Sequence, residues 1–200
     1  AGFVLLNLFQ TLQWYCRVLP KDRVTGAYYA AIFGRLSVPA AAEGLLMVDR
    51  STDGAEHLSD EAGYDQRELF LDRFDDRPDS VMTLSAQDPY SPGPHVPYSA
   101  ITAKDHAWLR VTADLLVPDT VRGVPPVLVV AFHHDGRSYK YRTGTWPLPL
   151  PVGARTVPIT MDYLTPEVRS TQDDVKVYLW SQDGSTWRVD DLRVQVFEPK

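Results

Sequence analysis

The 200-residue chain has few of the residues that staple a small domain or bind phosphate. Its single cysteine, Cys16, excludes an internal disulfide and the paired-cysteine motifs of redox and zinc sites. Basic residues number 20 against 26 acidic ones, which gives a formal net charge of −6. A nucleic-acid partner needs a basic face to neutralise its phosphates, so we expect none.

The sequence also lacks the common catalytic motifs. It contains no GxSxG, no HExxH, no P-loop and no GxGxxG. Carboxylates are plentiful and a glycosidase needs only two of them, but spacing alone selects no pair. We therefore expect a domain that is not an enzyme.

Charge is absent from the first sixteen residues, AGFVLLNLFQTLQWYC. One interpretation is the end of a membrane helix, since a complete span needs about 20 apolar residues. The other is an amphipathic helix packed on the domain, because one helical face collects apolar residues. That face consists of Leu5, Leu8, Phe9, Leu12 and Cys16. We favour the membrane origin, which makes lipid a partner of the N-terminal segment.

The next part of the chain predicts a short second helix. Pro20 ends the first helix, Thr25 can cap the second, and Gly34 stops it. We expect residues 1–36 to form a helical lead-in. Residues 37–43, with Pro39 and an alanine run, predict a linker, and residues 44–200 a β-sandwich domain.

From residue 44 onward the apolar pattern has the period of two that is typical of strands. It is clearest in 108–117, where alternate residues are apolar. Asp135-Gly136 between two such runs is a strong hairpin signal. Four prolines in Asp88–Pro97 predict a rigid surface loop. The predicted strands are 45–48, 67–74, 81–85, 108–117, 127–132, 138–142, 155–163, 175–180 and 187–197. Strands without intervening helices indicate an antiparallel sandwich or barrel.

Two segments resemble known proteins. DDVKVYLWSQDGSTWRVDDLRVQVFEP, residues 173–199, resembles the closing hairpin of jelly-roll β-sandwiches of the carbohydrate-binding-module type, with Ser181 where that pattern usually has asparagine. LLNLFQTLQWYCRVLPKDRVTGAYYAAIFG, residues 5–34, is similar to a segment of multi-pass membrane proteins of Bacteroidetes that resemble lipid-sugar-dependent glycosyltransferases. The two matches contain no catalytic motif.

The resemblance implies a mainly β fold, an antiparallel jelly-roll-like β-sandwich with a short N-terminal helical segment. It also implies a periplasmic location, on the extracytoplasmic face of the bacterial inner membrane. Arg17, Lys21 and Arg23 follow the apolar segment and favour the cytoplasmic side under the positive-inside rule. The two indications of compartment disagree.

Aromatic residues are the candidate ligand-binding residues. Tyr139 and Tyr141 share one face of a predicted strand, and Tyr178 and Trp180 share one face of another. Sugar rings present apolar C–H faces that stack on aromatic planes, so these four residues suit a carbohydrate. Alternatively the aromatic side chains pack inside the fold, where they bury much apolar area.

Acidic residues are the candidate metal ligands. Sandwiches of the resembled type often hold a structural calcium between an early strand and the closing strand. By position, Glu68, Asp72 and Asp190 are the candidates, with Asp191 beside them. Calcium takes six to eight oxygens, and Asp190 and Asp191 alternatively end an edge or cap a turn. Beyond this calcium we expect no cofactor.

The sequence thus favours a non-catalytic extracytoplasmic accessory domain of a membrane protein that recognises glycan. The alternative is a structural or protein-interaction β-sandwich without a small-molecule ligand. The adjacent His133 and His134 point to opposite faces of a strand, so a metal shared between them is not expected.

Overall fold

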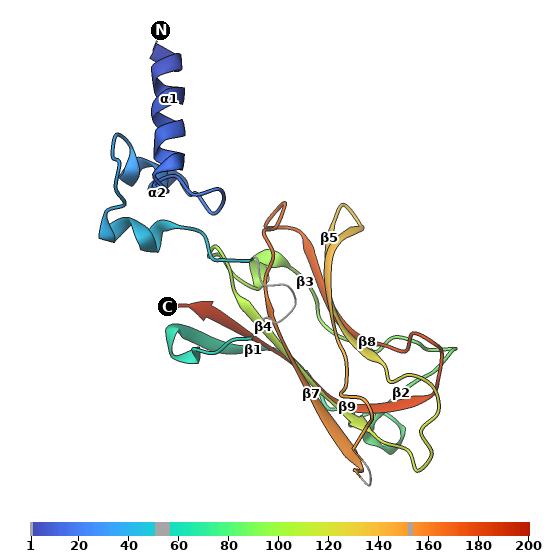
Figure 1. The fold of residues 1–200 in the computed structure, drawn as a ribbon. Helices are drawn as coiled ribbons and strands as arrows, with labels where there is room; N and C mark the ends of the chain where they lie inside the picture. Colours follow the sequence, from blue (N-terminus) through green and yellow to red (C-terminus); the bar gives the residue numbers. More distant parts are fainter. Residues whose placement is uncertain (1, 51–56, 152–153) are drawn as a thin grey trace. The chain divides into compact units, whose positions relative to one another are not determined.

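The computed structural model of the chain describes residues 2–50, 57–151 and 154–200. The chain forms two compact units, Ala1–Thr52 and Asp53–Lys200 (Figure 1). The first contains helix α1 (Gly2–Tyr15), helix α2 (Gly26–Ile32) and the 3₁₀ helix η1 (Ala40–Leu45). The second contains the strands.

The N-terminal unit is longer than the sequence predicted. Residues 37–43 are not a free linker, because η1 contacts α2 and Ala42 joins a small core with Tyr28 and Ile32. The predicted strand 45–48 is wrong as well. Met47 exchanges hydrogen bonds with Arg23, whose backbone oxygen accepts from Met47 N at 2.9 Å and whose Nε donates to Met47 O at 2.7 Å. This segment therefore pairs within the N-terminal unit and not with a sheet.

The predicted second helix and its cap are confirmed. Thr25 Oγ1 accepts a hydrogen bond from Tyr28 N at 2.9 Å, which satisfies one of the free amide groups at the start of α2. Gly34 follows the helix with a φ of 72°, a conformation that favours glycine.

Helix α1 docks through its polar residues. Gln13 is 1% exposed and its Nε2 donates to the backbone oxygens of Ile32 and Arg35, both at 2.9 Å. These carbonyls lie at the end of α2, where helical partners run out. The apolar face predicted for α1 is not buried: Leu5 is 67% and Leu8 63% exposed, and Cys16 is exposed too.

The second unit is a sandwich of two antiparallel sheets (Figure 1). The first sheet has the order β1-β9-β4-β7, with β2 also paired to β9, and the second has the order β3-β8-β5-β6. The strands are β1 (Tyr64–Asp72), β2 (Met82–Leu84), β3 (His95–Pro97), β4 (Trp108–Leu116), β5 (Val127–His134), β6 (Arg137–Gly144), β7 (Thr156–Leu164), β8 (Asp174–Trp180) and β9 (Trp187–Pro199).

The connectivity of the eight main strands is that of a jelly roll. The antiparallel pairs are nested, β1 with β9, β3 with β8, β4 with β7, and β5 with β6. A long hairpin that folds over once produces this nesting, and it places successive pairs alternately in the two sheets. The predicted fold class is therefore confirmed.

The core between the sheets follows the period-two pattern. In β4 the residues Leu109, Val111, Ala113 and Leu115 are all buried, as the alternation predicted. The matching positions of the other sheet are Leu128, Val130 and Phe132 in β5 and Val175, Val177 and Leu179 in β8. Asp135 and Gly136 turn the β5–β6 hairpin with φ values of 49° and 75°, which confirms the Asp-Gly turn.

A buried carboxylate holds the start of β8 to this hairpin. Asp173 is 2% exposed and accepts hydrogen bonds from Tyr139 Oη at 2.7 Å and His134 Nδ1 at 2.6 Å. It also accepts from the backbone amides of Arg169 and Ser170. These donors outweigh the effect of burial, and the pKa of Asp173 lies below its ordinary value.

We expect Asp173→Asn to lower the free energy of unfolding by about 1–3 kcal/mol at pH 7, because an amide leaves one buried donor without an acceptor. The pKa of this acid is depressed in the folded state, so its contribution is present above the unfolded pKa and is lost as the pH falls through the folded one. Urea unfolding at pH 7 and at pH 3 measures both effects. The exposed Asp119→Asn is the matched control, and equal losses for the two variants would contradict the prediction.

Candidate functional site

The outer face of the β3-β8-β5-β6 sheet carries a second apolar cluster. Residues directly opposite each other on neighbouring strands share a face, and here Val127 faces Trp180, Val129 faces Tyr178, and Ala131 faces Lys176. Val127, Val129 and Ala131 are buried although they lie outside the main core, and Tyr178 and Trp180 pack against them. The small side chains of β5 thus form a floor, and the aromatic side chains of β8 stand beside it.

Tyr90 extends this surface. Its ring stacks on Trp180, with centroids 6.0 Å apart and an interplanar angle of 23°, and meets Tyr178 edge-on at 5.6 Å. Tyr90 is 50% exposed, and Tyr178 and Trp180 are half-buried. Tyr141 on β6 lies opposite Ala131 and so shares this side of the sheet. We call Tyr90, Tyr141, Tyr178 and Trp180 the aromatic face.

The proline-rich segment positions Tyr90. Tyr90 forms an isolated bridge to Trp180, and Ser91 N donates to Leu179 O at 3.0 Å while Ser91 Oγ accepts from Leu179 N at 2.9 Å. The prediction that Asp88–Pro97 is only a loop is wrong, since His95–Pro97 is the edge strand β3. Proline is tolerated at such an edge because its missing amide faces away from the ladder.

Gly93 allows the segment to come this close to β8. A Cβ at this position would lie 1.9 Å from the backbone oxygen of Val177, so no other residue fits without moving the segment. The close approach of Gly93 therefore fixes the distance between the segment and the sheet.

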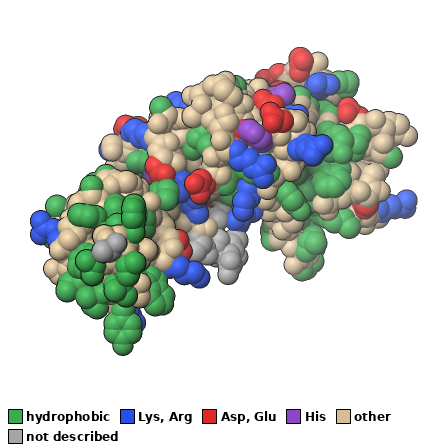
Figure 2. All heavy atoms as spheres, turned by 90° about the horizontal axis from the view of Figure 1, so that it is seen from above, with side chains coloured by type: hydrophobic (Ala, Val, Ile, Leu, Met, Phe, Trp, Pro, Cys, Tyr) green, Lys and Arg blue, Asp and Glu red, His purple; other side chains and the backbone are tan. Residues whose placement is uncertain are grey.

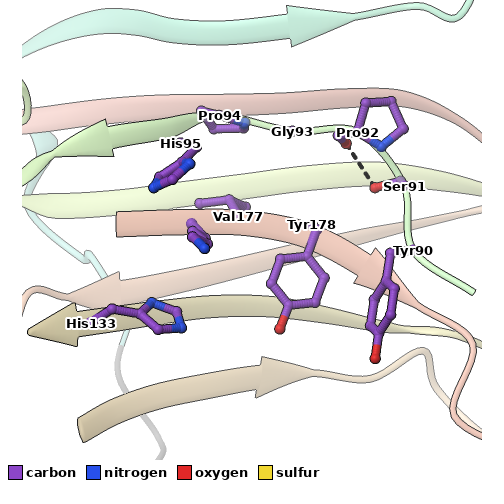
Figure 3. Close-up of a pocket in the computed structure, with 10 residues that line it drawn as sticks. Tyr90, Ser91, Pro92, Gly93, Pro94, His95, His133, Val177 and Tyr178 are labelled. Carbon is purple, nitrogen blue, oxygen red and sulfur yellow. Dashed lines mark hydrogen bonds between the residues drawn. The ribbon is translucent and has the colours of Figure 1, made fainter. Parts of the chain in front are cut away.

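A pocket of about 450 Å³ opens between this segment and the sheet (Figure 3). Its lining combines residues 90–95 of the segment with His133, Lys176, Val177 and Tyr178. Figure 3 shows Tyr90 and Tyr178 side by side with their hydroxyls pointing the same way, and His133 on the neighbouring strand. A volume of this size is typical of small-molecule sites, which combine apolar walls with a few polar groups.

The pocket shifts the pKa of two of its residues. Burial, together with the nearby Tyr90, raises the pKa of Tyr178, which keeps the phenol protonated. Burial lowers the pKa of His133 and Lys176 lowers it further, so His133 is neutral at pH 7. The pocket thus presents phenol hydroxyls and an uncharged imidazole, which suit hydrogen bonds to hydroxyl groups.

Three of the four predicted ligand-binding residues lie on this surface. Tyr178 and Trp180 flank the floor from β8, and Tyr141 lies opposite Ala131 on the other side and is 69% exposed. Tyr139 does not share their face. The register between β5 and β6 shifts after Phe132, and Tyr139 packs against the main core with its hydroxyl on Asp173.

The sequence pattern did not single out Tyr90 and Lys176 as binding residues, and it offered His133 only as a metal ligand that was not expected. Alternation in β8 places Lys176 on the same face as Tyr178, so the signal for the lysine was present. The opposite orientation of the two histidines is confirmed, because His133 lines the pocket while His134 bonds Asp173. Tyr90 gave no comparable signal, because its contacts depend on how the proline-rich segment folds back.

The three predicted metal ligands have other contacts. Glu68 lies 3.5 Å from Arg193 Nε, Asp72 accepts from Phe74 N at 2.8 Å, and Asp190 accepts from Asp191 N at 2.8 Å. In the part of the chain that the structure describes, no group of three or more His, Cys, Asp or Glu is arranged to hold a metal ion. Calcium at these residues stays a prediction.

Acidic residues nevertheless gather on the outer side of the other sheet. Burial raises the pKa of Asp114, and the nearby Asp191 and Asp190 raise it further. The pKa of Asp190 is raised too, by burial first and then by Asp191, Asp75 and Asp72. This repulsion opposes folding at neutral pH.

We expect Asp114→Asn to raise the melting temperature at pH 7 by about 1–3 °C, because it removes a carboxylate from this repulsion. A raised acid pKa means that protonation favours the folded state, so the penalty is absent below the unfolded pKa and complete above the folded one. The gain should therefore disappear in acid. Thermal unfolding between pH 3 and pH 8, in the presence of a chelator, measures it, and a gain that persists at low pH would contradict this explanation.

Comparison with known proteins adds little to this geometry. No family model matches the chain, and no curated protein matches it. Among solved structures it is similar to the VP2 subviral particle of infectious bursal disease virus, with 12% identity over 68% of this chain and 32% of that one, at a TM-score of 0.38. A structure of the Gt strain of the same virus gives 14% identity over the same shares at a TM-score of 0.35.

The chain spans about a third of the length of these structures. The strand connectivity defines the class of protein. By that connectivity the second unit is a jelly-roll β-sandwich.

Proposed function

We propose that this chain is a non-catalytic accessory domain of a membrane protein, located on the extracytoplasmic face of a bacterial inner membrane, and that its aromatic face recognises glycan. The observation that carries the proposal is the half-exposed group of Tyr90, Tyr178 and Trp180 beside a pocket. A domain that used these residues only for packing would be expected to bury them, as it buries Trp187 and Phe132.

The chemistry of the aromatic face suits a saccharide. The rings of Tyr90 and Trp180 are within 23° of parallel, and the half-exposed aromatic rings offer apolar faces on which the C–H face of a sugar can lie. The hydroxyls of Tyr90 and Tyr178 both donate and accept hydrogen bonds and project to the same side (Figure 3). Tyr141, across the β5 floor, extends the surface to a second ring of an oligosaccharide.

The exposed helix α1 supports the membrane part of the proposal. Figure 2 shows hydrophobic side chains gathered over the N-terminal unit. Those of α1 that are exposed are Phe3, Val4, Leu5, Leu8, Leu12, Trp14 and Tyr15. Aromatic residues at the end of an apolar helix, followed by Arg17 and Lys21, are typical of the boundary between lipid and water. Among the described helices, none is both long and apolar enough to cross a membrane.

The alternative is a protein-interaction or purely structural sandwich. The contact that favours it is the stacking of Tyr90 on Trp180, since these rings already satisfy part of each other's apolar surface. The two functions differ in one measurable respect, because only the glycan-binding domain loses a ligand when a ring of the aromatic face is removed.

We expect the full chain to bind a subset of saccharides on a glycan array, and Tyr178→Ala and Trp180→Ala each to weaken that binding at least about fivefold, because one stacked ring contributes about 1 kcal/mol or more. Phe33→Ala, which removes an exposed ring of the N-terminal unit, is the matched control. Circular dichroism checks that each variant is folded. Absence of binding to every saccharide, or equal loss in all three variants, would favour the alternative.

For the membrane part, we expect the full chain to sediment with phosphatidylcholine vesicles, and the double substitution Leu5→Gln with Leu8→Gln to reduce the bound fraction about tenfold or more, because two leucines leave the lipid. Val121→Gln with Val124→Gln, at two exposed positions of the sandwich, removes the same number of apolar side chains. Equal effects of the two doubles would show that α1 has no special affinity for lipid.

A further inference from the structure

We propose that the pocket beside the aromatic face takes a saccharide that carries a carboxylate, with Lys176 as the group that recognises the charge. This inference rests on the proposed glycan function and adds the class of ligand. It depends on the charges that line the pocket and on which of them are already paired.

Lys176 occupies the middle of the pocket lining. On β8 it lies between His95 of β3 on one side and Ala131 of β5 on the other, two residues before Tyr178. Its side chain is half-buried and makes no hydrogen bond or ion pair with any residue in the described ranges. The acid nearest in sequence, Asp174, is engaged by His95, whose Nε2 lies 3.3 Å from Asp174 Oδ1.

The pocket lining therefore contains one ammonium and no carboxylate on a chain whose formal charge is −6, and the carboxylate of Asp174 lies two residues away on the same strand. Most of the molecule repels an anion, and the pocket is a place where one is attracted. The other lysine of the same sheet does not line the pocket. Lys140 on β6 lies opposite the core residue Phe132, so it belongs to the other face and cannot reach the pocket.

His133 provides a second polar group, with a ring nitrogen that has no hydrogen-bond partner among the described residues. Its Nδ1 is buried and makes no hydrogen bond within the described part of the chain. Leaving such an atom unpaired is unfavourable, and a ligand hydroxyl that reaches it after a small movement of the ring would satisfy it. The lowered pKa of this imidazole agrees with a neutral partner for hydroxyls, which leaves Lys176 as the charged one.

A carboxylate fits this set better than a phosphate. Phosphate sites are usually built from arginine forks or several backbone amides, which neutralise nearly two negative charges. Here one ammonium neutralises one charge, and the neighbouring aromatic rings offer a stacking surface for the sugar that bears it. A uronic acid presents both features within a single ring.

The test compares hexagalacturonate with its methyl ester, which has the same sugar rings without the charge. Isothermal titration of the full chain at low salt is expected to show the acid binding about tenfold or more tightly than the ester. Lys176→Met keeps the apolar stem and removes the ammonium, so it should abolish the preference for the acid while the affinity for the ester changes less than about twofold. Lys140→Met is the matched control and should leave the preference intact.

Each outcome decides between the two proposals. Equal binding of acid and ester by the wild type, or binding of neutral saccharides only, overturns the carboxylate inference and leaves the glycan function standing. A preference that Lys140→Met removes as effectively as Lys176→Met reflects general attraction and also overturns the inference. Failure of both hexasaccharides, together with failure of every acidic and neutral saccharide on the array, overturns both proposals. Phosphorylated hexose tested beside galacturonate distinguishes the two anions, and tighter binding of the phosphate contradicts the carboxylate assignment.

Discussion

Each strand of the sandwich presents alternate side chains to opposite faces, and only one of those faces can be buried between the sheets. The side chains that cover the outer face of each sheet are therefore the ones available for binding, and they differ between the two sheets. On the first sheet, Arg110 and Asp162 lie directly opposite each other, and Arg110 Nε donates to Asp162 Oδ1 at 2.7 Å. Asp162 also accepts from Leu58 N at 3.0 Å, so charged and backbone groups complete that face. On the second sheet, the outer residues of β5 are small and apolar, and aromatic rings complete the face instead.

The N-terminal unit also leaves apolar side chains exposed. Its helix α1 uses Gln10 and Gln13 for contacts with the region of α2, and Gln10 Nε2 donates to Tyr29 Oη at 2.7 Å. Two of the polar residues in the apolar run thus make contacts within the N-terminal unit, while leucines remain exposed. A protein surface normally has the opposite distribution, and a large exposed apolar patch marks an interaction site. Lipid is the partner that we propose, because the patch carries no charge to select a protein.

Much of the sandwich could be predicted from the sequence because the alternation in β4 and β8 is regular and the Asp135-Gly136 turn is specific. The failures occur where a tertiary contact overrides a local rule. Three prolines between Pro92 and Pro97 argue against a strand, but an edge position needs only some of the amides, and β3 forms there. Tyr139 follows the same alternation as Tyr141, but a register shift between β5 and β6 turns it toward Asp173. Residues 37–48 fold back for a similar reason, since Ala42 packs against α2 and Met47 pairs with Arg23, contacts that sequence patterns do not encode.

In the proposed function the pocket and the exposed face of α1 act together. A pocket with one ammonium and a few rings offers few contacts, and a ligand of that kind binds weakly when both partners diffuse freely. Attachment of the same chain to a membrane changes the situation, because it holds the pocket near any glycan carried on that surface. The second association then depends on an effective concentration and no longer on the bulk one, which strengthens binding without any new contact. In this proposal the chain selects its ligand through Lys176 and the aromatic face, and α1 would hold it at the membrane.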